Sequence, residues 1–185
     1  MRRIADLLFE ARILKELPRS GYHFLGSGRE SVAEHVYFTT FVGYVLAQMR
    51  PDVDGAKIVH MCLMHDLGEA RTGDLNYVQK KYVRSDEVKA LADLTQGLPF
   101  GGHIKALCEE FRKGETEEAK LAHDADQLAL VAELKALCDV GQKGPETWIP
   151  YVVDRIKTDA GRRLARELLE TPSDRWWFDE KNNAL

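Results

Sequence analysis

The chain of 185 residues contains little cysteine and no long hydrophobic run. Its three cysteines are too few and too scattered for a disulfide framework, and none forms the C-x-x-C pair of a cysteine zinc site. We expect each to be a small core residue of a reduced, cytoplasmic protein. The longest uncharged apolar-rich run, residues 36–49, is shorter than the roughly 20 residues of a bilayer span. Asp6 and Glu10 interrupt any signal-peptide core. The sequence therefore predicts a soluble protein without a membrane segment.

An excess of basic residues is also missing. Lysine and arginine number 26 against 30 aspartates and glutamates, which gives a net charge of -4. Modules that bind nucleic acid polymers usually carry a basic surplus, so we do not expect such a partner. Apolar residues at 44% and charged residues at 30% exclude a disordered chain. The length suits one domain, which we expect to cover residues 1–185.

Apolar residues recur at helical spacing along most of the chain, and period-two alternation is rare. This pattern predicts an all-α protein, a single-domain helical bundle. The predicted helices cover about residues 2–17, 31–50, 54–66, 85–96, 103–113, 116–140 and 147–170, the last one bent near 159–161. Residues 18–30 are predicted to form a loop rich in turn formers and aromatics.

The helix expected over residues 31–50 begins with a capping box. Ser31 and Glu34 can each satisfy a free backbone N–H of its first turn. The helix is apolar nearly all round, through residues such as Phe38, Phe41 and Val42, so we expect it in the centre of the fold. Thr116 is predicted to cap the long helix that follows it.

Two imidazoles and two carboxylates lie within or beside apolar stretches of three predicted helices. They belong to His35, His65, Asp66 and Asp126. Burying the Asp66 carboxylate after the apolar run 58–64 costs several kcal/mol unless it is paired or bound to a metal. Mixed nitrogen and oxygen ligands suit one divalent transition metal ion, such as Mn, Fe, Co, Ni or Zn. Spacing alone also allows the alternative that each is an ordinary core or surface residue.

Four motifs follow one another along the chain: residues 17–22 (LPRSGY), 30–35 (ESVAEH), 65–74 (HDLGEARTGD) and 125–128 (ADQL). In this order and spacing they resemble the motifs of the HD-domain metal-dependent phosphohydrolases, and within them the 5'-deoxynucleotidase branch. Residues 30–35 are similar to the branch's E-S-V-A/S-D/E-H opening, and residues 65–74 to its H-D-x-x-E-x-x-x-G-D core. Residues 125–128 (ADQL) resemble its distal D-Q or A-D segment, and residues 17–22 (LPRSGY) its P-R-T-G-W loop. The likeness spans about residues 8–140, followed by C-terminal helices and an aromatic tail over about 145–185.

The resemblance implies that His35, His65, Asp66 and Asp126 are the metal ligands. Asp124 competes with Asp126 for the last role, because the two differ by only two positions. At helical spacing their side chains point about 200° apart, so both cannot face one site. We prefer Asp126, which follows Ala and precedes Gln as the family's ligand does.

The resemblance further implies that Glu69 acts on the attacking water or the leaving group, and that Asp74 holds the water or the partner of Glu69. A carboxylate near a metal but not bound to it can move protons. Arg19 is the candidate for binding the substrate phosphate, since a guanidinium offers two parallel charge-assisted donors. Tyr22 stands where the branch usually has Trp, so the preference for deoxyribose over ribose stays open.

We therefore expect an enzyme, a metal-dependent phosphohydrolase that releases phosphate from nucleoside 5'-monophosphates with one divalent metal ion. An HD-type phosphodiesterase or triphosphohydrolase acting on another small phosphate ester is the second hypothesis. A non-catalytic helical sensor or scaffold is the third. The family resemblance also implies a homodimer, and the tail residues 176–178, two Trp and a Phe, could pack either against a partner or onto their own chain.

Overall fold

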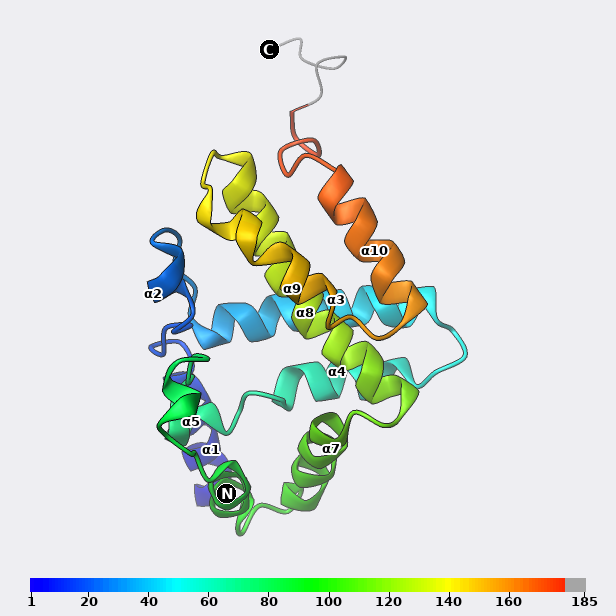
Figure 1. Cartoon of the computed structure of the whole chain (residues 1–185). Coiled ribbons are helices and arrows are strands. Elements are labelled where there is room, and N and C mark those ends of the chain that lie inside the picture. Colours follow the sequence, from blue (N-terminus) through cyan, green and yellow to red (C-terminus); the bar gives the residue numbers. More distant parts are fainter. Residues whose placement is uncertain (179–185) are drawn as a thin grey trace.

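The computed structural model describes residues 1–178, and over that range the chain is helical with no strand (Figure 1). In chain order the elements are α1 (Arg2–Ile13), α2 (Tyr22–Leu25), α3 (Val32–Met49), α4 (Gly55–Met64), α5 (Glu69–Thr72), the 3-10 turn η1 (Gln79–Lys81), α6 (Glu87–Thr95), α7 (Gly101–Lys113), α8 (Glu117–Asp139), the 3-10 turn η2 (Gly144–Thr147), α9 (Ile149–Val153) and α10 (Asp159–Glu170). The predicted all-α architecture is confirmed.

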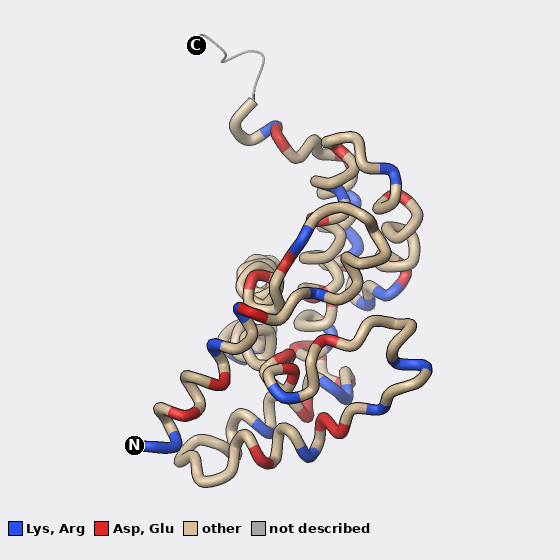
Figure 2. Tube along the Cα trace, turned by 90° about the vertical axis from the view of Figure 1, so that its left-hand side faces the viewer, with Lys and Arg blue, Asp and Glu red and all other residues tan. Residues whose placement is uncertain are grey.

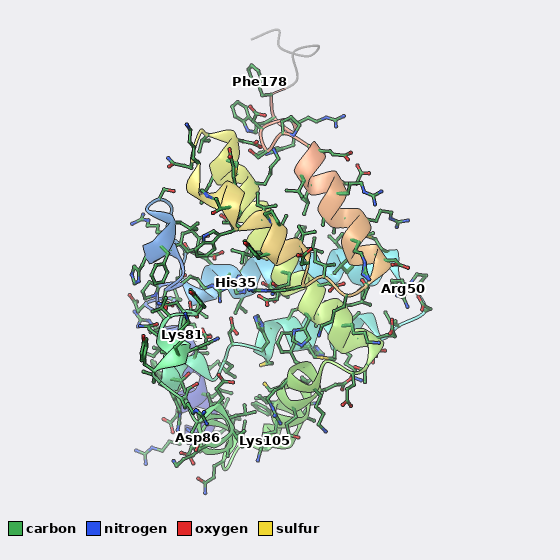
Figure 3. All side chains as sticks on the ribbon, viewed as in Figure 1. His35, Arg50, Lys81, Asp86, Lys105 and Phe178 are labelled. Carbon is green, nitrogen blue, oxygen red and sulfur yellow. The ribbon has the colours of Figure 1, made fainter. Side chains whose placement is uncertain are left out.

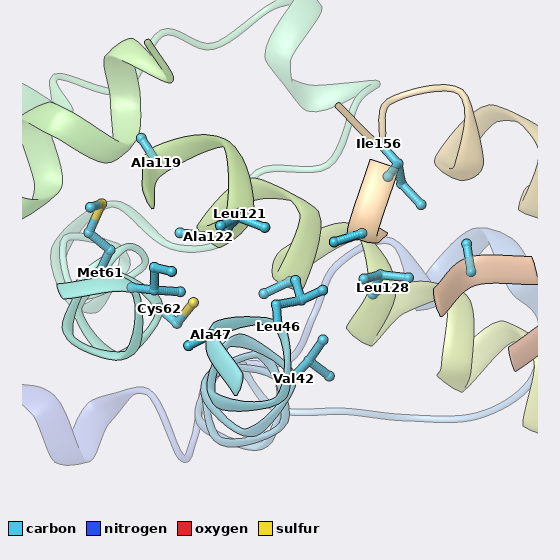
Figure 4. Packing of buried hydrophobic residues seen from close by; sticks show 14 of the residues in the cluster. Val42, Leu46, Ala47, Met61, Cys62, Ala119, Leu121, Ala122, Leu128 and Ile156 are labelled. Carbon is cyan, nitrogen blue, oxygen red and sulfur yellow. The ribbon is translucent and has the colours of Figure 1, made fainter. Parts of the chain in front are cut away.

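The centre of the fold is formed by α3, α4 and α8, which pack on one another (Figure 4). Fully buried side chains such as Leu46, Met61 and Leu128 fill the space between them. Gly43 allows the closest approach of α3 and α4, because a Cβ at that position would lie 2.6 Å from the sulfur of Cys62. The close packing of these helices brings their polar residues to one place.

Two smaller clusters extend this core. The first lies between α1, the start of α3, α6 and α7, and includes Leu7, Leu94 and Ile104. The second lies where α2 and α9 pack on the C-terminal half of α8, with Leu25 and Val152 among its members. The central core of α3, α4 and α8 thus has further helices packed on two of its sides.

Several predicted helix ends were wrong. Helix α1 ends at Ile13 instead of residue 17, because the N–H groups of residues 14–16 bond to carbonyls three residues back, as in a 3-10 turn. The carbonyls of Leu14 and Leu17 accept bonds from the N–H groups of Ala33 and Val32. The predicted loop contains the short helix α2. Helix α4 ends at Met64.

The last predicted helix is divided. Residues 154–158 separate α9 from α10, so the chain breaks there and does not merely bend at 159–161. Thr158 caps α10 by accepting from the N–H of Gly161 at 3.0 Å. The capping boxes and caps predicted at Ser31 and Thr116 are confirmed.

Some expectations about burial were also wrong. Phe41 of α3 is 54% exposed, since the outer face of that helix is uncovered. Cys62 is buried as predicted, whereas Cys108 and Cys138 are only half-buried.

Acidic and basic residues alternate over the trace (Figure 2). Among residues 1–178 we find no helix with the length and hydropathy needed to cross a membrane.

Candidate metal centre and adjoining cavity

His35 lies in the first turn of α3, immediately after the capping box. The Ser31 hydroxyl accepts from the N–H of Glu34 at 3.2 Å, and the Glu34 carboxylate accepts from the N–H of Ser31 at 2.6 Å. These two bonds fix where the helix starts and therefore where its next residue points. The His35 side chain is only 1% exposed and faces α4 and α8 (Figure 3).

His65 and Asp66 follow the last residue of α4. The Nδ1–H of His65 donates to the carbonyl of Cys62 at 2.7 Å. Because a carbonyl can only accept, this bond leaves Nε2 as the nitrogen free to bind a metal. Nε2 is buried and has no hydrogen-bond partner among residues 1–178. Nε2 lies 3.2 Å from Oδ2 of the Asp66 carboxylate, but the two groups are not aligned for a hydrogen bond.

Asp126 comes from the middle of α8. Its Oδ1 accepts from the Nε2–H of His35 at 2.9 Å. Asp124, the alternative from the sequence, is on the other side of the helix. It accepts from the backbone N–H groups of Lys157 and Thr158 at 2.7 and 2.8 Å. The structure therefore places Asp126, and not Asp124, beside the two histidines.

The ligand atoms of His35, His65 and Asp126 all lie within 4.8 Å of one another. Asp66 borders this group, with Oδ2 3.9 Å from the Nε2 of His35. An unpartnered buried imidazole nitrogen next to two carboxylates is an unfavourable arrangement for a protein alone. The donors, two imidazoles and two carboxylates, fit a divalent transition metal ion. The residues present are thus suited to hold such an ion.

The ionisable side chains of the metal-ligand group shift one another's pKa values. Burial lowers the pKa of His65, but the negative charges of Asp66 and Asp126 outweigh it and raise the pKa to about 9. Burial raises the pKa of Asp126, and the hydrogen bond and charge of His35 more than reverse this and hold it well below its usual range. A proton on His65 therefore occupies the position that a bound cation would take.

The loop that joins α1 to α3 brings Arg19 to the same place. Its Nη1 lies 3.5 Å from the Oδ2 of Asp66, and its side chain is 19% exposed. The backbone N–H of Ser20 donates to the carboxylate of Asp74 at 2.8 Å, which ties this loop to the turn after α5. Asp74 thus lies against the loop, and no hydrogen bond joins it to Glu69 in the described residues.

Tyr22 lies farther from the metal ligands. Its hydroxyl donates to the carboxylate of Glu30 at 3.5 Å. Glu30 is a buried residue that the sequence arguments missed, although it opens the ESVAEH motif. Its Oε2 lies 3.9 Å from the Nε of Arg19 and 4.0 Å from the Nδ1 of His35. Burial raises the pKa of Glu30 to about 7. The carboxylate connects the substrate-binding candidates with a metal-ligand candidate.

Glu69 is the first residue of α5 and faces a cavity of about 360 Å³ next to the metal-ligand group. One of its carboxylate oxygens is buried without a hydrogen-bond partner. Burial, followed by the charges of Asp66 and Asp74, raises the pKa of Glu69 to about 9. Glu69 consequently holds a proton at neutral pH.

The cavity also has walls that the sequence arguments did not identify. The ring of Phe111, from α7, lies 5.0 Å from that of His65 and stacks on His123 at 4.1 Å. Lys105 and Arg112 of α7 line the same cavity. No local motif marks these residues, because they reach the site only through the packing of α7 against α4 and α8.

Comparison with known proteins agrees with this geometry. A family model described as HD domain matches residues 11–167. The curated protein 5'-deoxynucleotidase HDDC2 of Dictyostelium discoideum is 30% identical over 132 residues, covering 65% of this chain and 70% of the relative. Its mouse counterpart of the same name is 27% identical over 136 residues, covering 70% of this chain and 67% of the relative.

Solved structures share the fold. A conserved hypothetical protein from Pyrococcus furiosus superimposes with a TM-score of 0.75 at 29% identity, covering 90% of this chain and 99% of the other. A predicted metal-dependent phosphohydrolase from Magnetospirillum magnetotacticum gives a TM-score of 0.71 at 24% identity, covering 91% of this chain and 90% of the other. At that identity the second match bears on the fold alone.

Proposed function

The chain belongs to the HD domain family, and from this premise we propose that it is a metal-dependent phosphohydrolase acting on deoxynucleoside 5'-monophosphates. The observation that carries the proposal is the convergence of His35, His65 and Asp126 beside a cavity of ligand size. Two relatives are named 5'-deoxynucleotidases, which supports the substrate class.

In this proposal His35, His65, Asp66 and Asp126 hold one divalent ion. When bound, the ion supplies a Lewis acid and lowers the pKa of a coordinated water. The chain's own contribution begins with the hydrogen bond from His65 to the carbonyl of Cys62, which presents Nε2 to the ion. Mn, Co, Fe, Ni and Zn all suit these ligands.

Arg19 neutralises the phosphate that is to be released. Burial lowers the pKa of its guanidinium, but the carboxylates of Asp66 and Asp74 outweigh this and raise it, so the positive charge is permanent. The bond between Ser20 and Asp74 fixes the loop that carries Arg19. Tyr22 lies on the same loop, beyond Glu30, where a sugar or base could contact it.

Glu69 manages the proton of the reaction. In the metal-free protein its pKa is raised to about 9, and the protonated carboxyl group can donate to the leaving O5' of the nucleoside as the bond to phosphorus breaks. Asp74 contributes its negative charge to the pKa of Glu69 and holds the Arg19 loop. We propose both as catalytic residues, Glu69 through proton transfer and Asp74 through this support.

The test is phosphate release from dAMP, dGMP, TMP, dUMP and dCMP, each with added Mn²⁺ or Co²⁺, with the ribonucleotides alongside. We expect release from the deoxynucleotides, and its loss in Asp66→Ala. Asp52→Ala is a matched control, because Asp52 is an exposed aspartate paired with Arg50, in the turn after α3. A metal-loaded protein that releases no phosphate from any of these substrates would contradict the proposal.

The same screen covers the other hypotheses. Turnover of a diester or of a nucleoside triphosphate in place of monophosphates would identify a phosphodiesterase or triphosphohydrolase. Failure to take up metal after reconstitution would favour a sensor or scaffold. Metal analysis of the purified protein therefore accompanies the activity screen.

We also propose that the protein is a cytoplasmic homodimer. Free thiols at Cys62, Cys108 and Cys138 fit a reducing compartment. The outer face of α3 carries Tyr37, Phe41 and Tyr44, which are 72%, 54% and 52% exposed. Their spacing places them on one face of the helix, and exposed aromatics are enriched in interfaces.

Sedimentation tests whether the protein is a dimer, and sedimentation of variants tests where the interface lies. We expect a dimer for the native protein and a monomer for Phe41→Glu. In the tail, the residues Trp176, Trp177 and Phe178 are 85%, 62% and 48% exposed, so much of their surface is open to a partner. Trp176→Ala is the matching variant there. A monomer at micromolar concentration for the native protein would contradict the dimer, and dissociation by Trp176→Ala alone would move the interface to the tail.

A further inference from the structure

The cavity beside the metal-ligand group extends well beyond the residues used so far. At one end it is lined by His65, Asp66 and Glu69. From there it runs between α6 and α7, which pack on each other (Figure 1). Leu91 and Ala92 form part of the α6 wall. A substrate whose phosphate lies at the metal-ligand end would have the rest of its body between these two helices.

Three cationic side chains line this same cavity. They are Lys80 of η1 and Lys105 and Arg112 of α7, with Lys105 marked in Figure 3. Lys105 and Arg112 are seven residues apart, so they lie on one face of the helix, two turns from each other. Lys113 follows directly in sequence but does not line the cavity.

None of these three cations has an ion-pair partner in residues 1–178. Elsewhere many basic side chains are paired, as Lys57 is with Glu110 at 2.6 Å. Four acidic residues, Asp66, Glu69, Glu87 and Glu109, also line the cavity, but none comes within 4.0 Å of the three cations. Three positive charges therefore face the cavity without a counter-charge in contact.

Arg19 does not belong to this set. It lies beside Asp66 and does not line the cavity between α6 and α7. Its charge is already assigned to the phosphate that is released. A nucleoside monophosphate has no second anionic group to place against Lys80, Lys105 and Arg112.

We propose that Lys80, Lys105 and Arg112 form a second phosphate subsite, and that the substrate class includes nucleotides carrying another phosphate besides the one hydrolysed. The inference rests on the proposed function. Water adds its oxygen to the phosphorus at the metal-ligand end, and the bond from that phosphorus to the leaving oxygen breaks. The leaving oxygen is O5' in a 3',5'-bisphosphate and the bridging oxygen in a 5'-diphosphate, and it takes a proton. Inorganic phosphate leaves, and the product retains its second phosphate at the subsite. Charge-assisted hydrogen bonds to Lys and Arg are the strong interactions that such a group would gain.

The experiment compares dAMP, deoxyadenosine 3',5'-bisphosphate and dADP at constant ionic strength with the same metal. We expect kcat/KM for one of the doubly phosphorylated substrates to exceed that for dAMP by about tenfold or more, the gain of one charge-assisted bond. The two substrates distinguish a phosphate on the 3' oxygen from one in a diphosphate chain. In Lys105→Gln/Arg112→Gln the ratio should fall toward one, and in the control Lys113→Gln it should stay.

A binding measurement accompanies the kinetics. Calorimetry with deoxyadenosine 3'-monophosphate and with deoxyadenosine should show that the phosphate strengthens binding in the native protein and not in the double variant. Lys105→Gln alone serves if the double variant does not fold. An equal fall of kcat/KM for all three substrates would mean general attraction of anions and would overturn the subsite. Turnover of dAMP with no preference for a second phosphate overturns the subsite alone, whereas no turnover of any nucleotide overturns the proposed function. If no nucleotide is turned over, the binding measurement still tests whether the phosphate subsite exists.

Discussion

Asp124 and Asp126 lie two residues apart on α8, and their carboxylates serve opposite sides of the helix. Asp124 is fully buried and accepts from the N–H of Lys157, the N–H of Thr158 and the hydroxyl of Thr158, the last at 2.6 Å. Asp126 accepts from the imidazole of His35 at 2.9 Å. One carboxylate holds the start of α10, and the other faces the candidate metal centre.

The first prediction separates these two roles. Asp124→Asn should lower the free energy of unfolding by about 3 kcal/mol, because a buried charged acceptor of three hydrogen bonds is weakened. Asp126→Asn should lower metal affinity, which Asp124→Asn should leave unchanged. Thermal unfolding of metal-free samples and metal titration measure the two quantities. If Asp124→Asn lost the metal while keeping its stability, the assignment would be reversed.

Metal binding should depend on pH through His65. In the metal-free protein its pKa is raised to about 9, so at neutral pH a proton must leave before Nε2 can bind a metal. The apparent Kd for Mn²⁺ should therefore decrease as the pH rises from 6 toward 9, by up to about tenfold per pH unit for this one proton. Calorimetry in buffers of different ionisation enthalpy should show about one proton released. A Kd independent of pH would refute this.

Glu69→Gln should retain the metal and lose most turnover. The amide keeps the size of the side chain but cannot supply the proton that Glu69 holds at neutral pH. We expect kcat to fall by about 10² to 10⁴. Asp66→Ala provides the contrast, since it should lose metal and activity together. Metal content below one ion per chain in Glu69→Gln would show that Glu69 is a ligand.

Arg19→Gln should weaken binding of the phosphate and decrease kcat/KM for dAMP by about a hundredfold, the loss of a charge-assisted bidentate contact. Arg19→Lys should recover only part of this, because an ammonium lacks the planar pair of donors. Steady-state kinetics with metal-loaded protein measures both variants. Unchanged kcat/KM in Arg19→Gln would remove Arg19 from the substrate site.

Glu30 should make the metal-free protein less stable at higher pH. Its pKa is about 7 in the folded state and near 4.5 when unfolded, so the unfolded state loses its proton first as the pH rises. The free energy of unfolding therefore falls between pH 4.5 and pH 7, by an amount on the order of 3 kcal/mol for this group. Glu30→Gln should remove that decline. Melting curves at pH 5 and pH 8 with a chelator present test this, and parallel curves for both proteins would contradict it.

Local sequence signals predicted most helix starts well. The hydrogen bonds of the capping box at Ser31 and of the cap at Thr116 join residues three positions apart. All the groups that form them therefore lie within one short stretch of sequence, which a local pattern can identify. Helix ends were predicted less well. Helix α1 stops at Ile13, where the next N–H groups bond to carbonyls three residues back. The carbonyls of residues 14 and 17 then bond to Ala33 and Val32, which lie outside the local pattern.

For the candidate site, the motifs around His35, His65 and Asp126 identified residues that the fold brings within 4.8 Å of one another. The same motifs did not reveal Glu30 as the buried link between Arg19, Tyr22 and His35. They did not reveal the α7 wall either, because Lys105 and Phe111 belong to an ordinary amphipathic helix.

By itself, the sequence determined the helical class, the caps and the residue types that could bind a metal, since these follow from contacts between near neighbours and from the chemistry of single side chains. Tertiary structure alone decided that Asp124 holds α10, that Phe41 is exposed, and that three cations without an ion-pair partner in residues 1–178 line the cavity. The physical reason is that these properties depend on which helices pack together, and helices distant in sequence are brought together by burial of their apolar faces, which a periodic pattern does not specify.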